Sequence, residues 1–296
     1  MSVVIARLIG GLGNQMFQYA AGRALSLRQQ ADLKLDLSGF GAYVRRRYEL
    51  DTFPLPAVAA TDGELACFGV TPIGRSGFLD RARRRLRLPT RLRALPVYRE
   101  PHFHYDAIMP ALRAPVYLDG YWQSERYFSD CAETVRRDFI PADPLDADNA
   151  TIAAQINAVN AVSLHVRRGD YVDDPATSVY HGVCSPDYYL RAVDYIAARI
   201  EAPHVFVFSD DSEWTYDNIR LSVPTTIVKV NSPDRGYRDM QLMAMCSHHI
   251  IANSSFGWWG AWLNPSHEKI VVAPSRWFNA SKNDTSDLIP KAWVRL

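Results

Sequence analysis

The sequence has few cysteines, little excess charge and no long apolar stretch, and each shortage excludes a class of protein. Its four cysteines lie far apart and form no CxxC pair, which excludes a zinc ribbon and a dense disulfide framework. Lys and Arg number 33 against 32 Asp and Glu, so a net charge of +1 does not suit a protein that coats nucleic acid. This cysteine usage favours reduced thiols in a cytosolic protein.

No segment has the composition of a signal peptide or a membrane-spanning helix. The N-terminal apolar run lacks a basic flank and is interrupted by Gly10 and Gly11. The longest stretch without Asp, Glu, Lys or Arg is 240–267, and it carries polar side chains such as Gln241 and His248, which are costly in hydrocarbon. We therefore expect a cytoplasmic protein, with peripheral contact at the inner face of the cytoplasmic membrane as the further hypothesis.

What is present is ordinary globular composition in a chain long enough for two domains. The 296 residues are 48% hydrophobic and 22% charged, enough apolar material for sizeable cores. The stretch 141–150, PADPLDADNA, has no apolar period and is the best linker candidate. We expect an N-terminal acceptor-side domain over 1–150 and a C-terminal nucleotide-sugar domain over 151–296.

Hydrophobic periodicity predicts an α/β fold in both halves. An apolar run at 3–9, a glycine turn, a helix at 16–27 and an alternating segment at 31–37 form a βαβ unit, whereas 40–115 is expected to be irregular. A further strand is expected at 116–122. The second half alternates near-continuous apolar strands with helices, which is typical of a parallel sheet covered on both faces. Its expected strands are 161–168, 204–211, 225–230, 248–253 and 269–274.

Polar residues follow several of these strands, where parallel α/β folds bind ligands. GGLGNQ (10–15) follows the first strand and opens a helix whose N-terminus favours anions. Its spacing is not the dinucleotide fingerprint, because the third glycine position falls on Met16, and no GK[ST] follows as in a Walker A loop. A plain strand–helix turn is the alternative.

HVRRGDY (165–171) places two adjacent arginines at a strand end. Alternation sends Arg167 and Arg168 to different sides, so one can bind a phosphate bidentately while the other pairs with Asp170. A purely structural Arg–Asp network is the alternative. His165 points to the same side as Arg167, although a lone histidine there is more often a core residue.

Acids and hydroxyls follow two further strands. Asp210 and Asp211 suit hydrogen bonds from ribose hydroxyls or base N–H groups, with a metal site as the competing interpretation. The only D-x-D, Asp146-Ala147-Asp148, lies in the linker, which argues against metal binding there. Ser254 and Ser255 precede a tryptophan-rich helix, which they either cap or join in binding phosphate, while its tryptophans pack in the core.

Two other stretches suggest partners. In GYWQSERYF (120–128), Tyr121, Trp122, Gln123 and Glu125 combine rings with amide and carboxyl groups, which suits sugar binding, with a packed loop as the alternative. The stretch Arg75 to Arg93 contains eight arginines and one acid. A solvated face is the default there, and contact with anionic lipid headgroups is the sharper hypothesis. The stretch lacks the interleaved aromatic residues that are typical of a segment that binds single-stranded nucleic acid.

Five motifs together resemble the bacterial α-1,2-fucosyltransferases, glycosyltransferase family 11. They are GGLGNQMFQYAAGRAL, GYWQSERYF, HVRRGDY, FSDDSEW and ANSSFGWWGAWL, and they span residues 10 to 263 in family order. The resemblance implies a GT-B fold, two Rossmann-like domains with parallel sheets facing across a cleft. It also implies inverting transfer of L-fucose from GDP-β-L-fucose to the 2-hydroxyl of a terminal galactose, without cofactor or metal, in surface O-antigen synthesis.

The resemblance also implies residue roles. Arg167 holds the β-phosphate, His165 lies by the nucleotide, and Asn14 with its glycine loop faces the donor sugar and diphosphate. The catalytic candidates are Arg167, Asn14 and Asp170. The resemblance does not name a base; Asp170 is a candidate base by its position in the sequence, and Asp36 is a weaker one. The expected donor-binding set is Gly11, Gly13, Asn14, His165, Arg167, Asp210, Asp211, Asn253, Ser254, Ser255 and Phe256.

Three hypotheses stay open at this point. The first is the fucosyltransferase, with a galactose-terminated glycan as acceptor and a lipid-linked form of it as a further hypothesis. The second is the same catalyst with another GDP-6-deoxysugar donor such as GDP-colitose, in which only the sugar-facing side chains differ. The third is a non-catalytic protein that binds GDP-sugars, which the intact set of phosphate-binding residues argues against.

Overall fold

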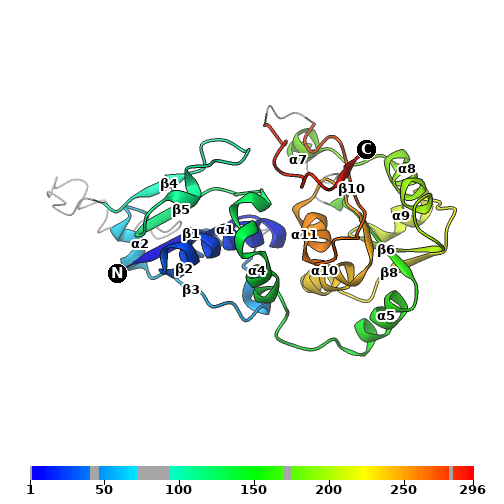
Figure 1. The fold of residues 1–296 in the computed structure, drawn as a ribbon, viewed down its shortest axis with the longest axis horizontal. Coiled ribbons are helices and arrows are strands. Elements are labelled where there is room, and N and C mark those ends of the chain that lie inside the picture. Colours follow the sequence, from blue (N-terminus) through cyan, green and yellow to red (C-terminus); the bar gives the residue numbers. More distant parts are fainter. Residues whose placement is uncertain (1, 41–46, 72–93, 170–171, 173–174, 280–282) are drawn as a thin grey trace. The chain divides into compact units, whose positions relative to one another are not determined.

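The computed structural model describes residues 2–40, 47–71, 94–169, 172, 175–279 and 283–296 (Figure 1). The chain divides into two compact units. Unit 1 comprises Met1–Ala142 and Ser286–Leu288, and unit 2 comprises Asp143–Thr285 and Ile289–Leu296. Each unit contains one sheet in which all described strand pairs are parallel. The expectation of an α/β fold with two parallel sheets is confirmed.

The sheet of unit 1 has the strand order β3-β2-β1-β5-β4. The expected βαβ unit is present as β1 (Val3–Arg7), α1 (Leu12–Gln29) and β2 (Asp32–Asp36), and β5 (Val116–Asp119) pairs with β1 on its other side. Helix α1 packs closely on β1, because a Cβ on Gly22 would lie 3.0 Å from that of Ala6.

The expectation that 40–115 is irregular is wrong in part, because two edge strands lie there. They are β3 (Val58–Ala59), beside β2, and β4 (Val97–Arg99), beside β5. Both are too short to show a period of two, and pairing with a neighbouring strand defines them. The other elements of unit 1 are η2 (Leu50–Thr52), α2 (Asp62–Cys67), η3 (Met109–Ala111), η4 (Glu125–Tyr127), η5 (Ser129–Cys131) and α4 (Ala132–Asp138).

The sheet of unit 2 has the strand order β11-β10-β9-β6-β7-β8. The strands are β6 (Asn160–Val166), β7 (Pro203–Ser209), β8 (Thr225–Val228), β9 (His248–Ile250), β10 (Val271–Ala273) and β11 (Val294–Arg295). The helices are α5 (Ala147–Asn157), α7 (Pro175–His181), α8 (Pro186–Ala197), α9 (Ser212–Asn218), η6 (Pro233–Arg235), α10 (Gly236–Met245) and α11 (Ser255–Leu263).

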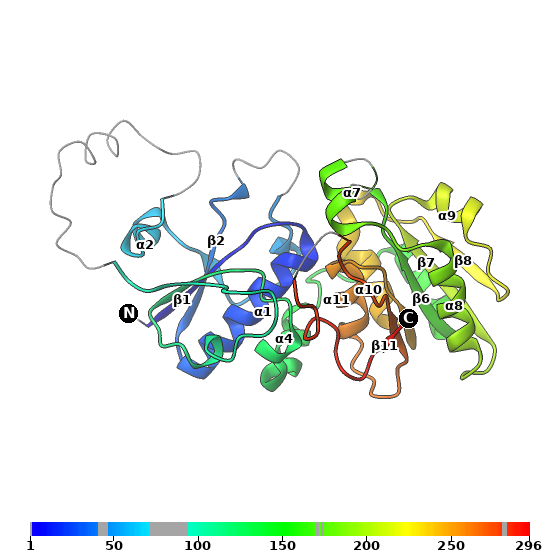
Figure 2. The ribbon, with the colours of Figure 1, turned by 90° about the horizontal axis from the view of Figure 1, so that it is seen from above.

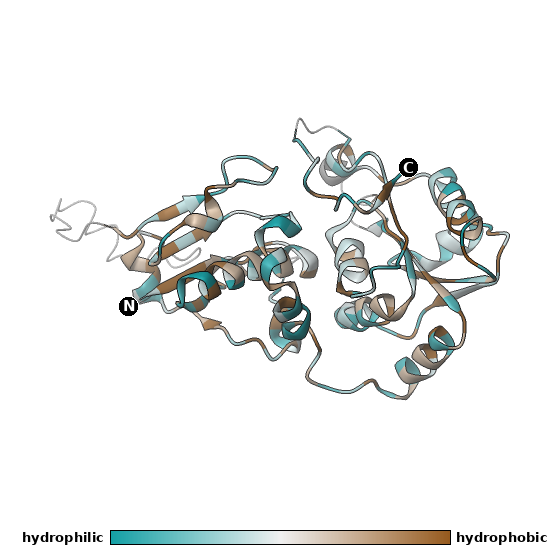
Figure 3. Ribbon diagram, in the orientation of Figure 1, coloured by the Kyte–Doolittle hydropathy of each residue, from teal (hydrophilic) through white to brown (hydrophobic). Residues whose placement is uncertain are grey.

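Hydrophobic cores lie on both faces of this second sheet. One face of β6 and β7, with Leu164 and Val207, packs against Tyr189 of α8. The other face, with Phe206, packs against α5 and against Leu242 of α10. Figure 2 shows α8 and α10 on opposite sides of the sheet, and Figure 3 shows hydrophobic residues along the strands. These two cores explain why the strands of this half read as nearly continuous apolar runs.

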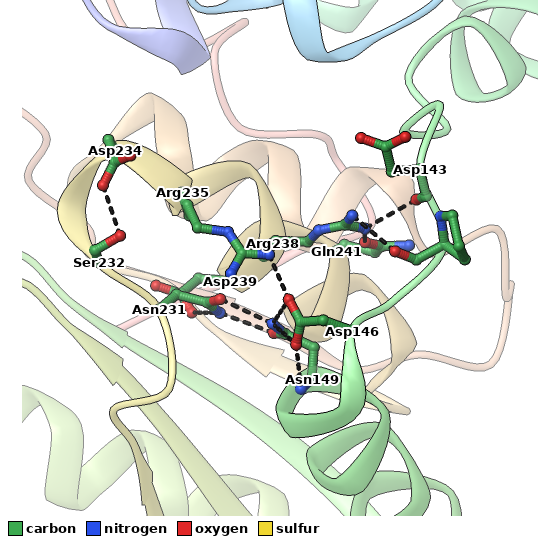
Figure 4. Close-up of polar contacts among 11 residues, drawn as sticks. Asp143, Asp146, Asn149, Asn231, Ser232, Asp234, Arg235, Arg238, Asp239 and Gln241 are labelled. Carbon is green, nitrogen blue, oxygen red and sulfur yellow. Dashed lines mark hydrogen bonds and ion pairs between the residues drawn. The ribbon is translucent and has the colours of Figure 1, made fainter.

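The boundary between the units falls at Ala142 instead of residue 150, because the expected linker is bonded to unit 2 (Figure 4). The Arg238 guanidinium donates to the carbonyls of Asp143 (3.1 Å) and Pro144 (2.8 Å). Asp146 accepts the N–H of Asn149 (3.0 Å) at the start of α5 and also pairs with Arg235. The D-x-D of the linker is therefore the beginning of a helix.

Candidate active site

An arginine and an aspartate meet where β6 and β7 end. The parallel register pairs Val166 with Ser209, so the residues after each strand emerge side by side. Arg167 Nη1 lies 2.8 Å from Asp210 Oδ2. A Cβ on Gly169 would lie 2.6 Å from the same oxygen, so the loop passes directly over this carboxylate. A guanidinium carries five N–H donors in a fork, so the same group can hold a carboxylate and a phosphate together.

Arg168 has structural partners. Its Nε lies 3.2 Å from Asp211 Oδ2, and its guanidinium stacks 3.6 Å above the centre of the Trp214 ring. Its backbone N–H donates to Asp210 (2.8 Å). Asp211 also caps α9, accepting the N–H of Trp214 (3.1 Å). The arginine expected to pair with an acid thus pairs with Asp211; the partner expected from the sequence, Asp170, lies outside the described residues.

His165 is buried beneath the start of α11. His165 is 5% exposed, and the centre of its ring lies 5.3 Å from the centre of the Phe256 ring. Burial, with the neighbouring Arg167, lowers the pKa of His165 to about 3, so the imidazole is neutral at physiological pH. Among the described residues, its Nδ1 has no hydrogen-bond partner. A Cβ on Gly257 would lie 2.6 Å from that atom, so only glycine leaves room for the ring.

Helix α11 begins with a serine cap and no acidic residue in its first turn. Ser254 accepts the N–H of Phe256 (3.3 Å), so the capping interpretation of this hydroxyl holds in the structure. Ser255 is the first residue of the helix and is partly exposed. Trp258 and Trp259 are fully buried, and the expectation that they belong to the core is confirmed. The first N–H groups of such a helix favour an anion.

The Asn253 side chain binds backbone. Its amide donates to the carbonyls of His181 (3.0 Å), Gly182 (3.3 Å) and Trp277 (3.1 Å), and the residue is 3% exposed. Asn253 therefore ties three chain segments together just before α11, and its contribution to a ligand site in this structure is to hold the start of that helix in place.

In unit 1, the glycine turn after β1 is built around Asn14. Gly10 has φ +81°, and a Cβ there would lie 2.6 Å from Asn14 Nδ2. Gly11 is the N-cap residue of α1, Gly13 is buried within its first turn, and that turn contains no acid. Gln123 donates to Asn14 Oδ1 (2.7 Å). This bond joins two sequence motifs that are far apart in the chain.

Of the four side chains predicted to bind the acceptor in the 120–125 turn, that of Tyr121 is the most exposed. Tyr121 is 39% exposed, whereas Trp122 is 1% exposed and Gln123 is buried. Glu125 is partly exposed and begins η4. The Trp122 ring lies in the unit's interior, so of the two aromatic residues Tyr121 is the one with a face available for a sugar ring.

Two carboxylates of unit 1 have structural partners. Asp36, the weaker base candidate, is 2% exposed and accepts the Tyr117 hydroxyl (2.6 Å) and the Ser38 N–H (2.9 Å), so it stabilises the sheet end. Glu100, which the sequence analysis missed, accepts the N–H groups of Tyr121 (2.7 Å) and Trp122 (3.0 Å). The sequence held no signal for this beyond a lone acid in a segment without periodicity.

Two kinds of site have no candidate in the described part of the chain, a metal centre and a membrane-spanning helix. Within that part, no group of three or more His, Cys, Asp or Glu residues is placed to hold a metal ion. No described helix has both the length and the apolar character needed to cross a bilayer. The basic stretch Arg75 to Arg93 lies outside the described residues.

Comparison with known proteins agrees with the motifs. The sequence profile described as Glycosyl transferase family 11 matches residues 101–296. An α-1,2-colitosyltransferase of Escherichia coli is 36% identical over 303 residues, covering 100% of this chain and 99% of that protein. The O-antigen biosynthesis glycosyltransferase WbnK of Escherichia coli is 32% identical over 323 residues, covering 98% and 99%. Human galactoside α-(1,2)-fucosyltransferase 1 is 32% identical over 155 residues, covering 49% of this chain and 42% of that protein. The profile spans more than half of the chain and two relatives match along their full length, so the chain belongs to glycosyltransferase family 11.

Proposed function

We propose that this enzyme transfers L-fucose from GDP-β-L-fucose to the 2-hydroxyl of a terminal galactose, forming an α-1,2 linkage with inversion. Family membership and the activities for which its relatives are named support the reaction class, and the relative WbnK supports a role in O-antigen synthesis. The observation that carries the proposal is the Arg167 guanidinium, held at the carboxyl end of β6 in the same unit as the start of α11.

Departure of the nucleotide needs stabilisation of negative charge. Breaking the bond between the sugar and GDP leaves a diphosphate and an electron-poor anomeric carbon. Arg167 and the first N–H groups of α11 supply positive charge and donors to the departing diphosphate, with Ser255 beside them. The neutral imidazole of His165 adds a hydrogen-bonding group without adding charge.

The remaining roles follow the motifs. We assign Asp210 and Asp211 to the guanosine end of the donor, with Arg168 fixing Asp211. Asn14, Gly11 and Gly13 are assigned to the donor sugar and diphosphate.

The acceptor is assigned to the turn with Tyr121 and Glu125, in which Trp122 and Gln123 provide support from within. Asp170, two residues after Arg168 in the sequence, is the proposed proton acceptor for the attacking hydroxyl.

A second donor is favoured by one observation. The relative that aligns with the whole chain at 36% identity is a colitosyltransferase, whereas the human fucosyltransferase aligns with half of it. Colitose is fucose without its 3-hydroxyl. A site that hydrogen-bonds this hydroxyl would discriminate against colitose by about 10⁴-fold or more, whereas an apolar site would discriminate only weakly between the two sugars.

The test is a direct competition between donors. The purified protein is incubated with equal concentrations of GDP-fucose and GDP-colitose and a galactose-terminated acceptor, and products are identified by mass and by linkage analysis. We expect fucosylated product with an α-1,2 linkage. A product carrying only colitose would establish the alternative donor. Tight binding of GDP-fucose with no transfer of either sugar would establish a non-catalytic binder.

We propose that the reaction needs no metal, which gives a prediction at the D-x-D of the linker. Asp146→Ala is expected to lower Tm, because it removes the cap of α5 and the partner of Arg235, while kcat stays unchanged. Asp148→Ala is the matched control, since Asp148 is exposed and is expected to change neither quantity. Loss of activity in both variants, or on addition of EDTA, would instead point to a metal held by the two carboxylates.

A lipid-linked acceptor at the inner face of the cytoplasmic membrane is the last part of the proposal. Each of the eight arginines from Arg75 to Arg93 would contribute about 1 kcal/mol of binding free energy near a surface of anionic headgroups. We expect the protein to float with liposomes that contain anionic lipid and to remain unbound with neutral ones. Equal behaviour with both liposomes would contradict membrane contact through this stretch.

A further inference from the structure

A carboxylate in unit 1 holds the turn that follows β5. Glu100 comes directly after β4, and its N–H donates to the carbonyl of Asp119 (2.9 Å), the last residue of β5. Its Oε2 accepts the N–H of Tyr121 (2.7 Å) and its Oε1 accepts the N–H of Trp122 (3.0 Å). Two successive backbone N–H groups that point at one anion form a nest, and here the anion is a side chain of the protein itself.

The turn held in this way has an unfavourable backbone. Trp122 has φ +56°, which is rare for a bulky side chain and persists only where the surroundings impose it. Its ring is buried, stacked with Tyr98 (6.3 Å between ring centres) and edge-on to Tyr127 (5.5 Å). A Cβ on Gly120 would lie 2.4 Å from that of Glu100, so the turn packs directly against the start of the Glu100 side chain.

The conformation of this turn reaches the glycine turn of β1. Gln123 follows Trp122 directly, and its amide donates to Asn14 Oδ1 (2.7 Å). Asn14 in turn lies against Gly10, the residue with φ +81°. Glu100 is therefore linked to Asn14 through one backbone step and one side-chain hydrogen bond, and a shift of the Trp122 backbone would move Gln123 away from its acceptor.

We propose that Glu100 is a positioning residue for sugar transfer: its ionised carboxylate fixes the 120–123 turn and, through Gln123, sets the orientation of Asn14. The inference rests on the proposed function and deepens it, because it explains how Tyr121 and Asn14, assigned above to acceptor and donor, are held by one group. Glu100 contacts Tyr121 at its backbone N–H, and it reaches Asn14 only through Gln123.

The role of Glu100 can be tested through pH, because its hold on the 120–123 turn depends on its charge state. Burial raises its pKa to about 7, although the two backbone N–H groups and His102 lower it. The other ionisable groups around it are Tyr98, Arg99, Asp106, Asp119 and Tyr127, of which Asp106 raises the pKa further. Protonation replaces an acceptor lone pair by an O–H donor, so the protonated carboxyl holds two N–H groups less well. The turn is expected to loosen as the pH falls through about 7.

Stability moves in the opposite direction, which separates the two effects. The pKa of Glu100 is raised in the folded state above its ordinary value of 4.5, so between these values the folded state binds more protons than the unfolded one. The contribution of this group to the free energy of unfolding therefore falls as the pH rises from 4.5 to 7. A loss of activity at pH 6 caused by Glu100 will not be accompanied by a loss of stability from the same group.

The experiment compares the full-length protein with Glu100→Gln between pH 5.5 and 8.5. In the wild type, we expect kcat at saturating donor to fall on the acid side with a midpoint near 7. Glu100→Gln is expected to lack this limb and to show a kcat at pH 8 lowered by about 10- to 100-fold, as for a mispositioned site. Glu133→Gln, an exposed carboxylate of α4, is the matched control and should behave as wild type.

A second measurement does not depend on transfer. In the ¹⁵N-labelled wild type, the backbone amide signal of Trp122 is expected to shift with a midpoint near pH 7. A Trp122 amide that does not titrate, or a Glu100→Gln enzyme with the wild-type kcat and acid limb, would overturn the inference. A wild type that transfers neither sugar would instead overturn the proposed function, and the Trp122 titration would still decide whether Glu100 holds the turn.

Discussion

Replacing Arg167 with alanine is expected to lower kcat by about 10²- to 10³-fold, which corresponds to roughly 3–4 kcal/mol of transition-state stabilisation. The guanidinium lies at the carboxyl end of β6, where it is paired with Asp210, and it is the charged donor assigned to the departing diphosphate. Most of this loss should appear in kcat, because the negative charge on the diphosphate grows as the sugar leaves. Initial rates at saturating donor and acceptor measure the effect.

Two further variants show whether the loss of rate is specific to the Arg167 guanidinium. Arg167→Lys keeps the positive charge but loses the planar fork, so it should recover only part of the rate. Arg191→Ala is the control in the same unit, because Arg191 forms an exposed pair with Asp187 on α8 and should leave kcat unchanged. The Tm of Arg167→Ala should stay close to wild type, since both members of the Arg167–Asp210 pair are partly exposed. Turnover at the wild-type rate in Arg167→Ala would refute the mechanism.

The second large effect is expected at Gly257. Alanine there would place a Cβ 2.6 Å from His165 Nδ1 and 3.3 Å from the Cβ of Ile251, so the buried imidazole or the start of α11 must move. Overpacking of this kind costs about 1–3 kcal/mol of stability. Displacement of His165 should also raise KM for the GDP-sugar, by a factor on the order of 10 to 100.

Gly63→Ala is the matched control for this variant. A Cβ on Gly63 meets nothing within 4 Å in the described structure, and Gly63 lies in the short helix α2, where alanine is the better helix former. Its Tm should stay the same or rise. If Gly257→Ala lowers Tm but leaves donor KM at the wild-type value, His165 does not contribute to donor binding and its role is confined to packing.

The class of fold and the places of most candidate residues can be inferred from the order of the amino acids alone. Apolar runs alternating with helical spacing are local signals, so β1, α1, β2 and the central strands of unit 2 could be predicted within a few residues. The motif residues after β6, β7 and β9 could be placed at one sheet edge because parallel strands share their carboxyl ends. The burial of the α11 tryptophans followed from their spacing and apolar surroundings.

Which side chains meet depends on how the helices and strands pack together. Arg168 pairs with Asp211 because the register of β6 and β7 brings their ends together, and no local pattern encodes that choice. The D-x-D of the linker proved to be the start of α5, bonded to Arg235 from a distant segment. Glu100 reaches the 120–123 turn because β4 pairs with β5. The three residues of β4 are too few for a strand to be predicted from the sequence. Local periodicity specifies an element, whereas a hydrogen-bond partner far along the chain is specified by the packing of all the elements together.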